Sequence, residues 1–179
     1  MTRLSPDGTL DGSFGSGGTV LLSVGQSDDI ALSVIEAPSG GLLLAGYSVV
    51  NSTDFSLLRL DSSGTPVSGF GSLGRQIFPV GTSHDTGFTL HALPDNMVAV
   101  AGHSFEGGTW QFSVIRFDAT TGVLDTNFGP VGSNGKVIVQ VGTGYGFGTS
   151  IVLQPDPDGP APNYKLLLAG PAQNGATYD

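Results

Sequence analysis

The chain contains no cysteine, few charged residues and no long apolar run. Without cysteine it forms neither a disulfide bond nor a thiolate metal site. No apolar stretch approaches the roughly 18 residues of a membrane-spanning helix, so we expect no membrane span. Only 12% of the residues are charged, and 6 Lys and Arg stand against 15 Asp and Glu, a formal net charge of −9. Because nucleic-acid binders present a basic surface, we expect no nucleic-acid partner.

A phrase of sequence occurs three times at intervals of about 56 residues. It runs from Arg3-Leu4 to Phe14-Gly15, from Arg59-Leu60 to Phe70-Gly71, and from Arg116-Phe117 to Phe128-Gly129. Self-similarity at a fixed period indicates a repeat architecture, in which each copy is one structural unit. We therefore predict a single repeat domain over residues 1–179, with units at about 16–71, 72–129 and 130–179.

Each copy contains short segments rich in Val, Ile, Leu, Phe and Thr, separated by Gly, Pro, Asp, Asn and Ser. No segment keeps a helical period over ten residues, so the fold class is all-β. The expected strands are 19–24, 30–37, 42–48 and 54–60 in the first copy, 74–80, 88–93, 97–103 and 111–117 in the second, and 136–141, 147–153 and 165–170 in the third. Four strands per unit of this length match the size of a propeller blade. We predict a β-propeller-like fold of three consecutive four-stranded antiparallel blades, the last incomplete. A β-solenoid is the alternative, but its rungs are usually shorter.

The order of short motifs within a copy resembles a known family. Phe-Gly is followed by Pro38-x-Gly40, then Leu43-Leu-Ala-Gly46, then Asp54-Phe-x-x-x-Arg-Leu60. This order resembles the delta-60 repeat, a bacterial β-propeller-like repeat. The resemblance implies a propeller blade and an extracellular or cell-surface location. It brings no catalytic residues with it.

Three blades leave open sheet edges, which invite pairing with another chain. One expectation is that further blades of a longer chain cover these edges. The other is a homo-oligomer, in which two chains close a six-bladed ring and residues 2–4 of one chain fill the missing outer strand of the other.

Residues present in every copy are expected to serve the scaffold. We predict that Arg3, Arg59 and Arg116 each form an ion pair or backbone clamp within their blade. Asp11 and Asp125 are expected to cap turns, with Ser68 as their counterpart in the middle copy.

The second copy departs most from the repeat, because it holds all three histidines, His84, His91 and His103. The strand pattern places His84 and His103 at one end of the blade and His91 at the other. His84, Asp85 and His103 are therefore the candidate catalytic residues, suited to a general base or a metal. The alternative is that these histidines are unrelated surface or packed side chains.

Two further departures are candidate binding sites. Glu106, Trp110 and Gln111 flank a glycine pair, and the single tryptophan suits a glycan or protein ligand if it is exposed. The alternative is that Trp110 packs on a blade edge. Asp156 and Asp158 stand in an Asp-x-Asp-Gly sequence that resembles the start of a calcium loop. No glutamate follows at the distance an EF-hand requires, so a stiff surface loop is the alternative. We expect no cofactor other than calcium.

The sequence shows no nucleophile or phosphate-loop signature in a suitable context. We therefore expect a non-catalytic binding or scaffold module of a secreted or cell-surface bacterial protein. A hydrolase or lyase with a site in the propeller funnel, with or without the assistance of a metal, is the alternative.

Overall fold

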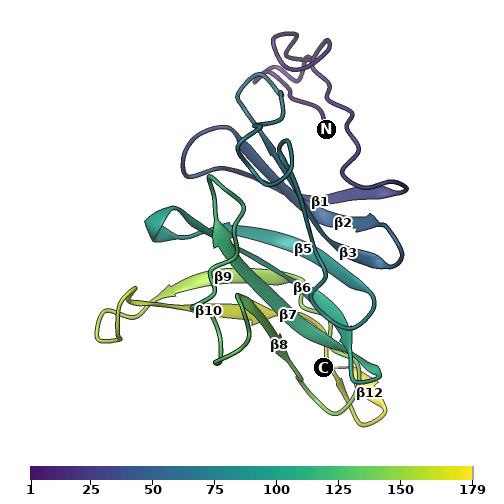
Figure 1. Cartoon of the computed structure of the whole chain (residues 1–179), viewed down its shortest axis with the longest axis vertical. Coiled ribbons are helices and arrows are strands. Elements are labelled where there is room, and N and C mark those ends of the chain that lie inside the picture. The colour runs from purple at the N-terminus through teal and green to yellow at the C-terminus, as the bar shows by residue number, and fades with distance from the viewer. Residues whose placement is uncertain (179) are drawn as a thin grey trace.

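The computed structural model in Figure 1 describes residues 1–178, and its regular secondary structure is almost entirely antiparallel β-sheet. Blade A contains β1 (Asp29–Glu36), β2 (Leu42–Val49), β3 (Thr53–Leu60) and β4 (Arg75–Phe78), paired in that order. Blade B contains β5 (Asp85–Ala92), β6 (Met97–Glu106), β7 (Thr109–Asp118) and β8 (Lys136–Val139), again in order, with the short 3-10 turn η1 (Pro94–Asn96).

Blade C is incomplete in the described part of the chain. It contains β9 (Ser150–Pro155) and β10 (Tyr164–Ala169), followed by a small hairpin of β11 (Gln173–Asn174) and β12 (Thr177–Tyr178). The three blades succeed one another from the N-terminal to the C-terminal end, and their sheets are not closed into a ring (Figure 1). The all-β, propeller-like prediction is confirmed. No helix within residues 1–178 is long and apolar enough to cross a membrane.

The outer strand of each complete blade comes from the segment that follows the Phe-Gly phrase. Residues 75–78, predicted as the first strand of the second copy, are β4 and pair with β3 of blade A, with Leu57 opposite Gln76. Residues 19–24, predicted as a strand, form no regular strand. Thr19 makes only isolated bridges, with Thr2 and Ser16.

A β-bulge recurs opposite a glycine and explains the repeated Ala-Gly pair. The pairing of β5 with β6 shifts register between Gly87 and Thr89, as the pairing of β1 with β2 shifts between Ala31 and Ser33. The bulge turns a carbonyl onto the neighbouring strand. A Cβ on Gly102 would overlap the Thr86 carbonyl oxygen, and Gly46 and Gly170 meet Ile30 and Phe147 in the same way. At all three positions the neighbouring backbone therefore leaves no room for a side chain.

Consecutive blades pack through a phenylalanine placed over glycines. Phe55 of β3 is fully buried and contacts the positions of Gly87 and Gly102 in blade B. Phe112 of β7 lies in the same way against Gly146 and Gly148 beside blade C. The core between blades A and B is built around these contacts by Leu43, Phe55, Leu57, Leu90, Val100 and Ile115. A flat ring thus fills the space that a missing Cβ leaves between two sheets.

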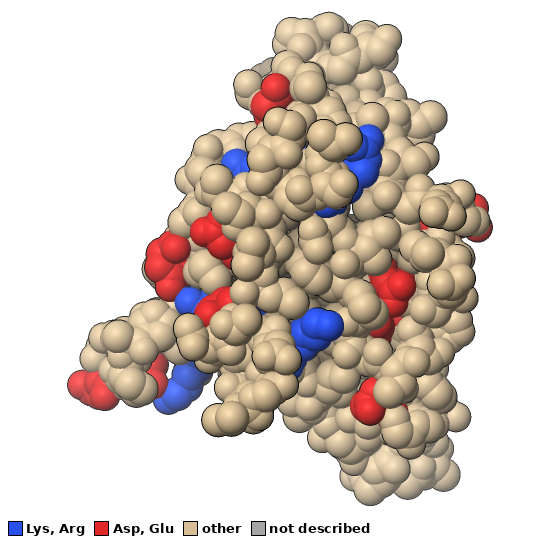
Figure 2. Space-filling view, in the orientation of Figure 1, with Lys and Arg blue, Asp and Glu red and all other residues tan. Residues whose placement is uncertain are grey.

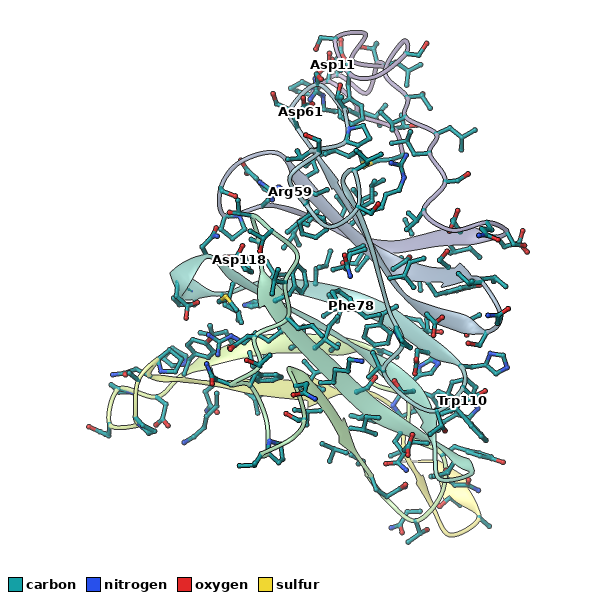
Figure 3. All side chains as sticks on the ribbon, in the orientation of Figure 1. Asp11, Arg59, Asp61, Phe78, Trp110 and Asp118 are labelled. Atoms are coloured by element: carbon teal, nitrogen blue, oxygen red, sulfur yellow. The ribbon has the colours of Figure 1, made fainter. Side chains whose placement is uncertain are left out.

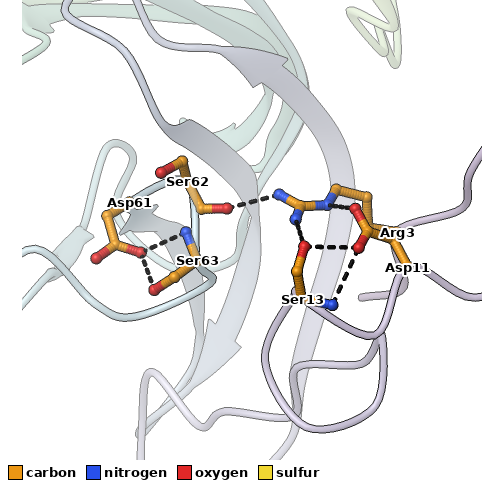
Figure 4. Close-up of polar contacts among 6 residues, drawn as sticks. All are labelled: Arg3, Asp11, Ser13, Asp61, Ser62 and Ser63. Carbon is orange, nitrogen blue, oxygen red and sulfur yellow. Dashed lines mark hydrogen bonds and ion pairs between the residues drawn. The ribbon is translucent and has the colours of Figure 1, made fainter.

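The repeated arginines are structural clamps, as predicted. Arg3 Nε lies 2.8 Å from the Asp11 carboxylate, and its Nη1 donates a hydrogen bond to the Ser62 carbonyl in the next copy (Figure 4). Arg116 pairs at 2.9 Å with Asp95 and at 3.4 Å with Asp125. Each of these arginines therefore joins segments that are distant along the chain.

The middle arginine lacks this carboxylate partner. The turn hydrogen bond from Phe14 to Asp11 is repeated from Phe70 to Val67, so the counterpart of Asp11 is Val67 and the assignment of Ser68 was wrong. Arg59 is only 5% exposed, and its Nη2 donates to Ser39 Oγ and the Gly40 carbonyl. Its Nε and Nη1 have no partner among the described residues. Burial lowers the pKa of Arg59, and the nearby Asp118 carboxylate acts in the opposite direction.

Replacing Val67 by aspartate is expected to stabilise the protein. The new carboxylate takes the place that Asp11 and Asp125 occupy beside Arg3 and Arg116 and accepts from the unpartnered guanidinium nitrogens. A hydrogen bond to a charged group contributes about 1.5–3 kcal/mol, and we expect a gain of that size in the free energy of unfolding measured with urea. Val67→Asn, which lacks the charge, is the matched control. Equal or lower stability of Val67→Asp relative to Val67→Asn would contradict this role of position 67.

Candidate functional site

One end of blade B carries a cluster of aromatic rings. This end holds the β6–β7 hairpin and the segments that lead into β5 and β9. The cluster, called here the aromatic end, consists of His84, Phe88, His103, Phe105, Trp110 and Phe147. Figure 3 shows Trp110 at this end of the sheets, with Arg59 and Asp118 toward the other.

Trp110 is the centre of the cluster and is partly exposed. Its ring lies edge-on to His103 at 4.9 Å between centroids and edge-on to Phe105 at 5.4 Å. The exposed His84 ring stacks nearly parallel to Trp110, with an interplanar angle of 25° and a centroid distance of 6.4 Å. An exposed imidazole and a partly exposed indole therefore lie next to each other at the surface.

The connection between blades B and C holds Trp110 in place. The Gly146 amide donates to the Trp110 carbonyl at 2.8 Å, and Thr109 Oγ1 donates to the Gly144 carbonyl at 3.2 Å. Gln140 Nε2 donates to the same Gly144 carbonyl at 2.7 Å. The tryptophan thus stands on a strand whose neighbouring segment is fixed by hydrogen bonds on both sides.

His103 is buried beneath the surface rings. It is 8% exposed, and its Nδ1 has no hydrogen-bond partner among the described residues. The rings of Phe88, Trp110 and Phe147 surround it at centroid distances of 4.9 to 5.1 Å. Burial lowers the pKa of His103 to about 4, because the imidazolium loses its hydration in this apolar setting. The ring is therefore neutral at pH 7 and packs as an aromatic side chain.

The buried His103 is expected to make stability depend on pH. The unfolded chain takes up a proton near pH 6.5, and the folded chain does so only near pH 4. Protonation therefore favours the unfolded state, and stability falls as the pH decreases from 6.5 to 4, by about 3 kcal/mol at most. Urea unfolding at closely spaced pH values measures this slope. His103→Phe should flatten it, whereas His84→Phe, at the exposed ring, should leave it in place. An unchanged slope in His103→Phe would show that another group causes it.

Asp85 belongs to the scaffold of the repeat. Its carboxylate is fully buried and accepts from the Val80 amide at 2.7 Å and the Gly81 amide at 2.9 Å. Asp29 receives the Val24 and Gly25 amides in the same way in blade A. In both blades the aspartate fixes the segment that leads into the first strand.

His84 is held by the neighbouring blade. Its Nδ1 accepts from the Thr53 amide at 3.3 Å, at the start of β3. The next residue, Asp54, has a raised pKa, first because of burial and then because of the Asp85 charge. The aromatic end thus has carboxylate groups beside it, while the imidazole of His84 faces solvent.

The structure brings together six of the candidates found in the sequence: His84, Asp85, His103, Glu106, Trp110 and Gln111 lie at the aromatic end. Gln111 Nε2 donates to the Glu106 carbonyl at 3.0 Å and closes the β6–β7 hairpin. His91 lies opposite Ala99, toward the other end of the blade, as predicted. Whether these residues bind or catalyse stays a prediction.

The two acidic candidates lie apart from this cluster, in the connection between β9 and β10. Asp156 forms an ion pair at 2.8 Å with Lys165, and Asp158 is exposed. Within residues 1–178 no group of three His, Cys, Asp or Glu side chains is arranged to hold a metal ion. Calcium binding by Asp156 and Asp158 stays a prediction.

Comparison with known sequences agrees with this architecture. Residues 37–70 and 93–128 match a family described as "Domain of unknown function (DUF5122) beta-propeller". Both matched segments begin before the second strand of a blade and end at the phenylalanine of the Phe-Gly phrase. The chain is built from propeller-like repeats. The segments that match the family model lie in the repeats of blades A and B. No curated protein and no solved structure matches the chain.

Proposed function

We propose that this chain is a non-catalytic binding or scaffold module whose contact surface is the aromatic end. The observation that carries the proposal is the stacked pair of Trp110 and His84, partly exposed on a base fixed by hydrogen bonds. Rings held on rigid strands give a large contact area at low cost in conformational entropy. Carbohydrate rings and the side chains of extended peptides are the ligands that stack on such surfaces.

The distribution of charged side chains on the surface supports an uncharged ligand. In the view of Figure 2, Lys and Arg and Asp and Glu occur in small separate groups with uncharged surface between them. The buried His103 and the scaffold aspartate Asp85 also favour packing and support roles over proton transfer. These two residues were the partners that a hydrolase or lyase at His84 would use.

We also propose that the repeats are delta-60 repeats of a secreted or cell-surface bacterial protein. The Phe-Gly and Arg-Leu motifs, which pack and clamp each blade, support the assignment to this repeat. The absence of cysteine and the low content of Lys and Arg support the location.

Glycan and peptide arrays probed with the full chain test the proposed function. We expect binding that Trp110→Ala and His84→Ala reduce at least tenfold, because each removes one of the two stacked rings. His91→Ala, at the opposite end of blade B, is the matched control and should bind as the unchanged protein does. Equal binding by all three variants would overturn the assignment of the aromatic end.

The same preparations distinguish the hydrolase or lyase. Turnover of esters, lactones or glycans that is lost in His84→Ala and retained in His91→Ala would overturn the non-catalytic proposal. Stoichiometric metal in the purified chain, lost in His84→Ala, would do the same.

A further inference from the structure

The two stacked rings of the aromatic end carry N–H groups that have no partner. His84 Nδ1 accepts from the Thr53 amide at 3.3 Å and lies 3.4 Å from Thr53 Oγ1, so the hydrogen of the neutral imidazole is on Nε2. Neither this Nε2–H nor the indole N–H of Trp110 forms a hydrogen bond among the described residues. The indole nitrogen is not one of the buried atoms without a partner, so it is open to solvent.

The main-chain acceptors at this end are already used within the chain. The carbonyl groups beside the rings each accept a hydrogen bond at 2.8 to 3.1 Å: those of His84, Phe105, Glu106 and Trp110. The buried Asp85 carboxylate accepts the amides of Val80 and Gly81. The aromatic end therefore presents free donors on its rings, while the main-chain acceptors around these rings have donors of their own.

A ligand that fits this surface has apolar faces, hydrogen-bond acceptors and few donors. An ordinary peptide brings one N–H per residue, and a sugar brings one O–H per hydroxyl. Each of these donors would lose water at the surface without gaining a main-chain acceptor. Proline has a carbonyl and an apolar ring but no N–H. A run of prolines forms a polyproline II helix before it binds, so docking it on aromatic side chains orders few additional bonds.

We propose that the ligand of the aromatic end is a proline-rich segment of another protein in the polyproline II conformation. This inference rests on the proposed function, because it names the ligand of the same surface. Proline rings of the segment pack on the faces of Trp110 and His84. Trp110 Nε1 and His84 Nε2 donate hydrogen bonds to carbonyl groups of the segment, so both rings contribute a contact face and a donor.

A labelled oligoproline of about eight residues tests the proposal by fluorescence anisotropy with the full chain. We expect saturable binding. A peptide of the same length with alanine at every second position is the matched control, because it restores N–H groups and loses ring contacts. This peptide should bind at least about tenfold more weakly. No saturable binding of the oligoproline, or equal binding of the two peptides, would overturn the proposal.

Variants that keep an aromatic ring and remove its N–H test the two hydrogen bonds. Trp110→Phe and His84→Phe should each weaken oligoproline binding about three- to tenfold, the loss expected for one hydrogen bond. His91→Phe, at the opposite end of blade B, is the matched control and should bind as the unchanged chain does. Circular dichroism establishes that each variant is folded, and the variant at the exposed His84 keeps the test valid if Trp110→Phe is not. Unchanged affinity in both ring variants would overturn the role of the N–H groups.

The ligand arrays separate this inference from the proposed function. A glycan or a proline-free peptide that binds more tightly than oligoproline, and loses binding in Trp110→Ala, would overturn the proline-rich ligand and leave the aromatic end as the contact surface. Oligoproline that binds Trp110→Ala as it binds the unchanged chain would place the segment elsewhere and overturn the inference. Oligoproline binding that only the Trp110 and His84 variants weaken supports both.

Sedimentation of the chain alone distinguishes a separate partner from a second copy. The β9–β10 connection is exposed and contains Pro155, Pro157, Pro160 and Pro162, so a second copy is the competing source of prolines. We expect the same sedimentation behaviour for the unchanged chain and for Trp110→Ala. Self-association that is lost in Trp110→Ala and in Pro157→Ala would assign the ligand to a second copy and overturn the assignment to another protein.

Discussion

Gly102→Ala is expected to lower the free energy of unfolding by about 4 kcal/mol or more. The added Cβ would overlap the carbonyl oxygen of Thr86 and lie 2.9 Å from Cζ of Phe55. The first of these atoms is backbone, held by the β5 bulge, and cannot rotate away. The sheet of blade B and its packing on blade A would both have to shift. Urea unfolding followed by circular dichroism measures the loss.

Gly69→Ala is the matched control for this substitution. No atom lies within 4 Å of a Cβ built at Gly69, and the backbone there is not in the left-handed region. We expect a change within about 0.5 kcal/mol, or a small gain from a less flexible unfolded chain. If Gly102→Ala were as stable as Gly69→Ala, the close contact between Gly102 and the bulge of β5 would be contradicted.

Phe55→Ala is expected to cost about 3–5 kcal/mol. The ring is fully buried between blades A and B, and the glycines on its far side leave no side chain to fill the space. A cavity between two sheets collapses poorly, because each sheet is held rigid by its own ladder. The loss should appear as a lower midpoint in urea, with a slope that is unchanged if the chain still unfolds in one step.

Leu21→Ala provides the comparison, since this side chain is 94% exposed and its removal should be nearly neutral. The loss of stability for Phe55→Leu should lie between the losses for Leu21→Ala and Phe55→Ala. A loss below 1 kcal/mol for Phe55→Ala would contradict the packing of the blades, because such a value is typical of an exposed site.

The repeat and most of the strands could be predicted from the sequence, since alternating apolar residues and glycine-rich turns are local signals. The partner of each strand could not. The pattern of residues 74–80 indicates a strand, but its pairing with β3 depends on how the connection after Arg59 turns back along the sheet. The error at Ser68 has a similar origin. The interval from the arginine to the aspartate is eight residues from Arg3 to Asp11 and nine from Arg116 to Asp125, and only the hydrogen bond from Phe70 to Val67 shows that the middle copy follows the first.

The candidate site was only partly predictable for a related reason. The histidines and the tryptophan were found as separate departures from the repeat, and the pairing of β6 with β7 brings His103 and Trp110 together. Phe147 belongs to the segment that leads into blade C, so its contact with both rings depends on how blades stack. No local pattern in the sequence carries that information.

The emission of Trp110 tests the central claim that the aromatic end is the contact surface. The chain has one tryptophan, so its fluorescence reports on this site alone. Titration with a glycan or peptide selected on the arrays should quench or shift the emission in a saturable way, with an affinity that His84→Ala reduces at least tenfold and His91→Ala leaves unchanged. Binding detected by calorimetry with no change in Trp110 emission would contradict the claim.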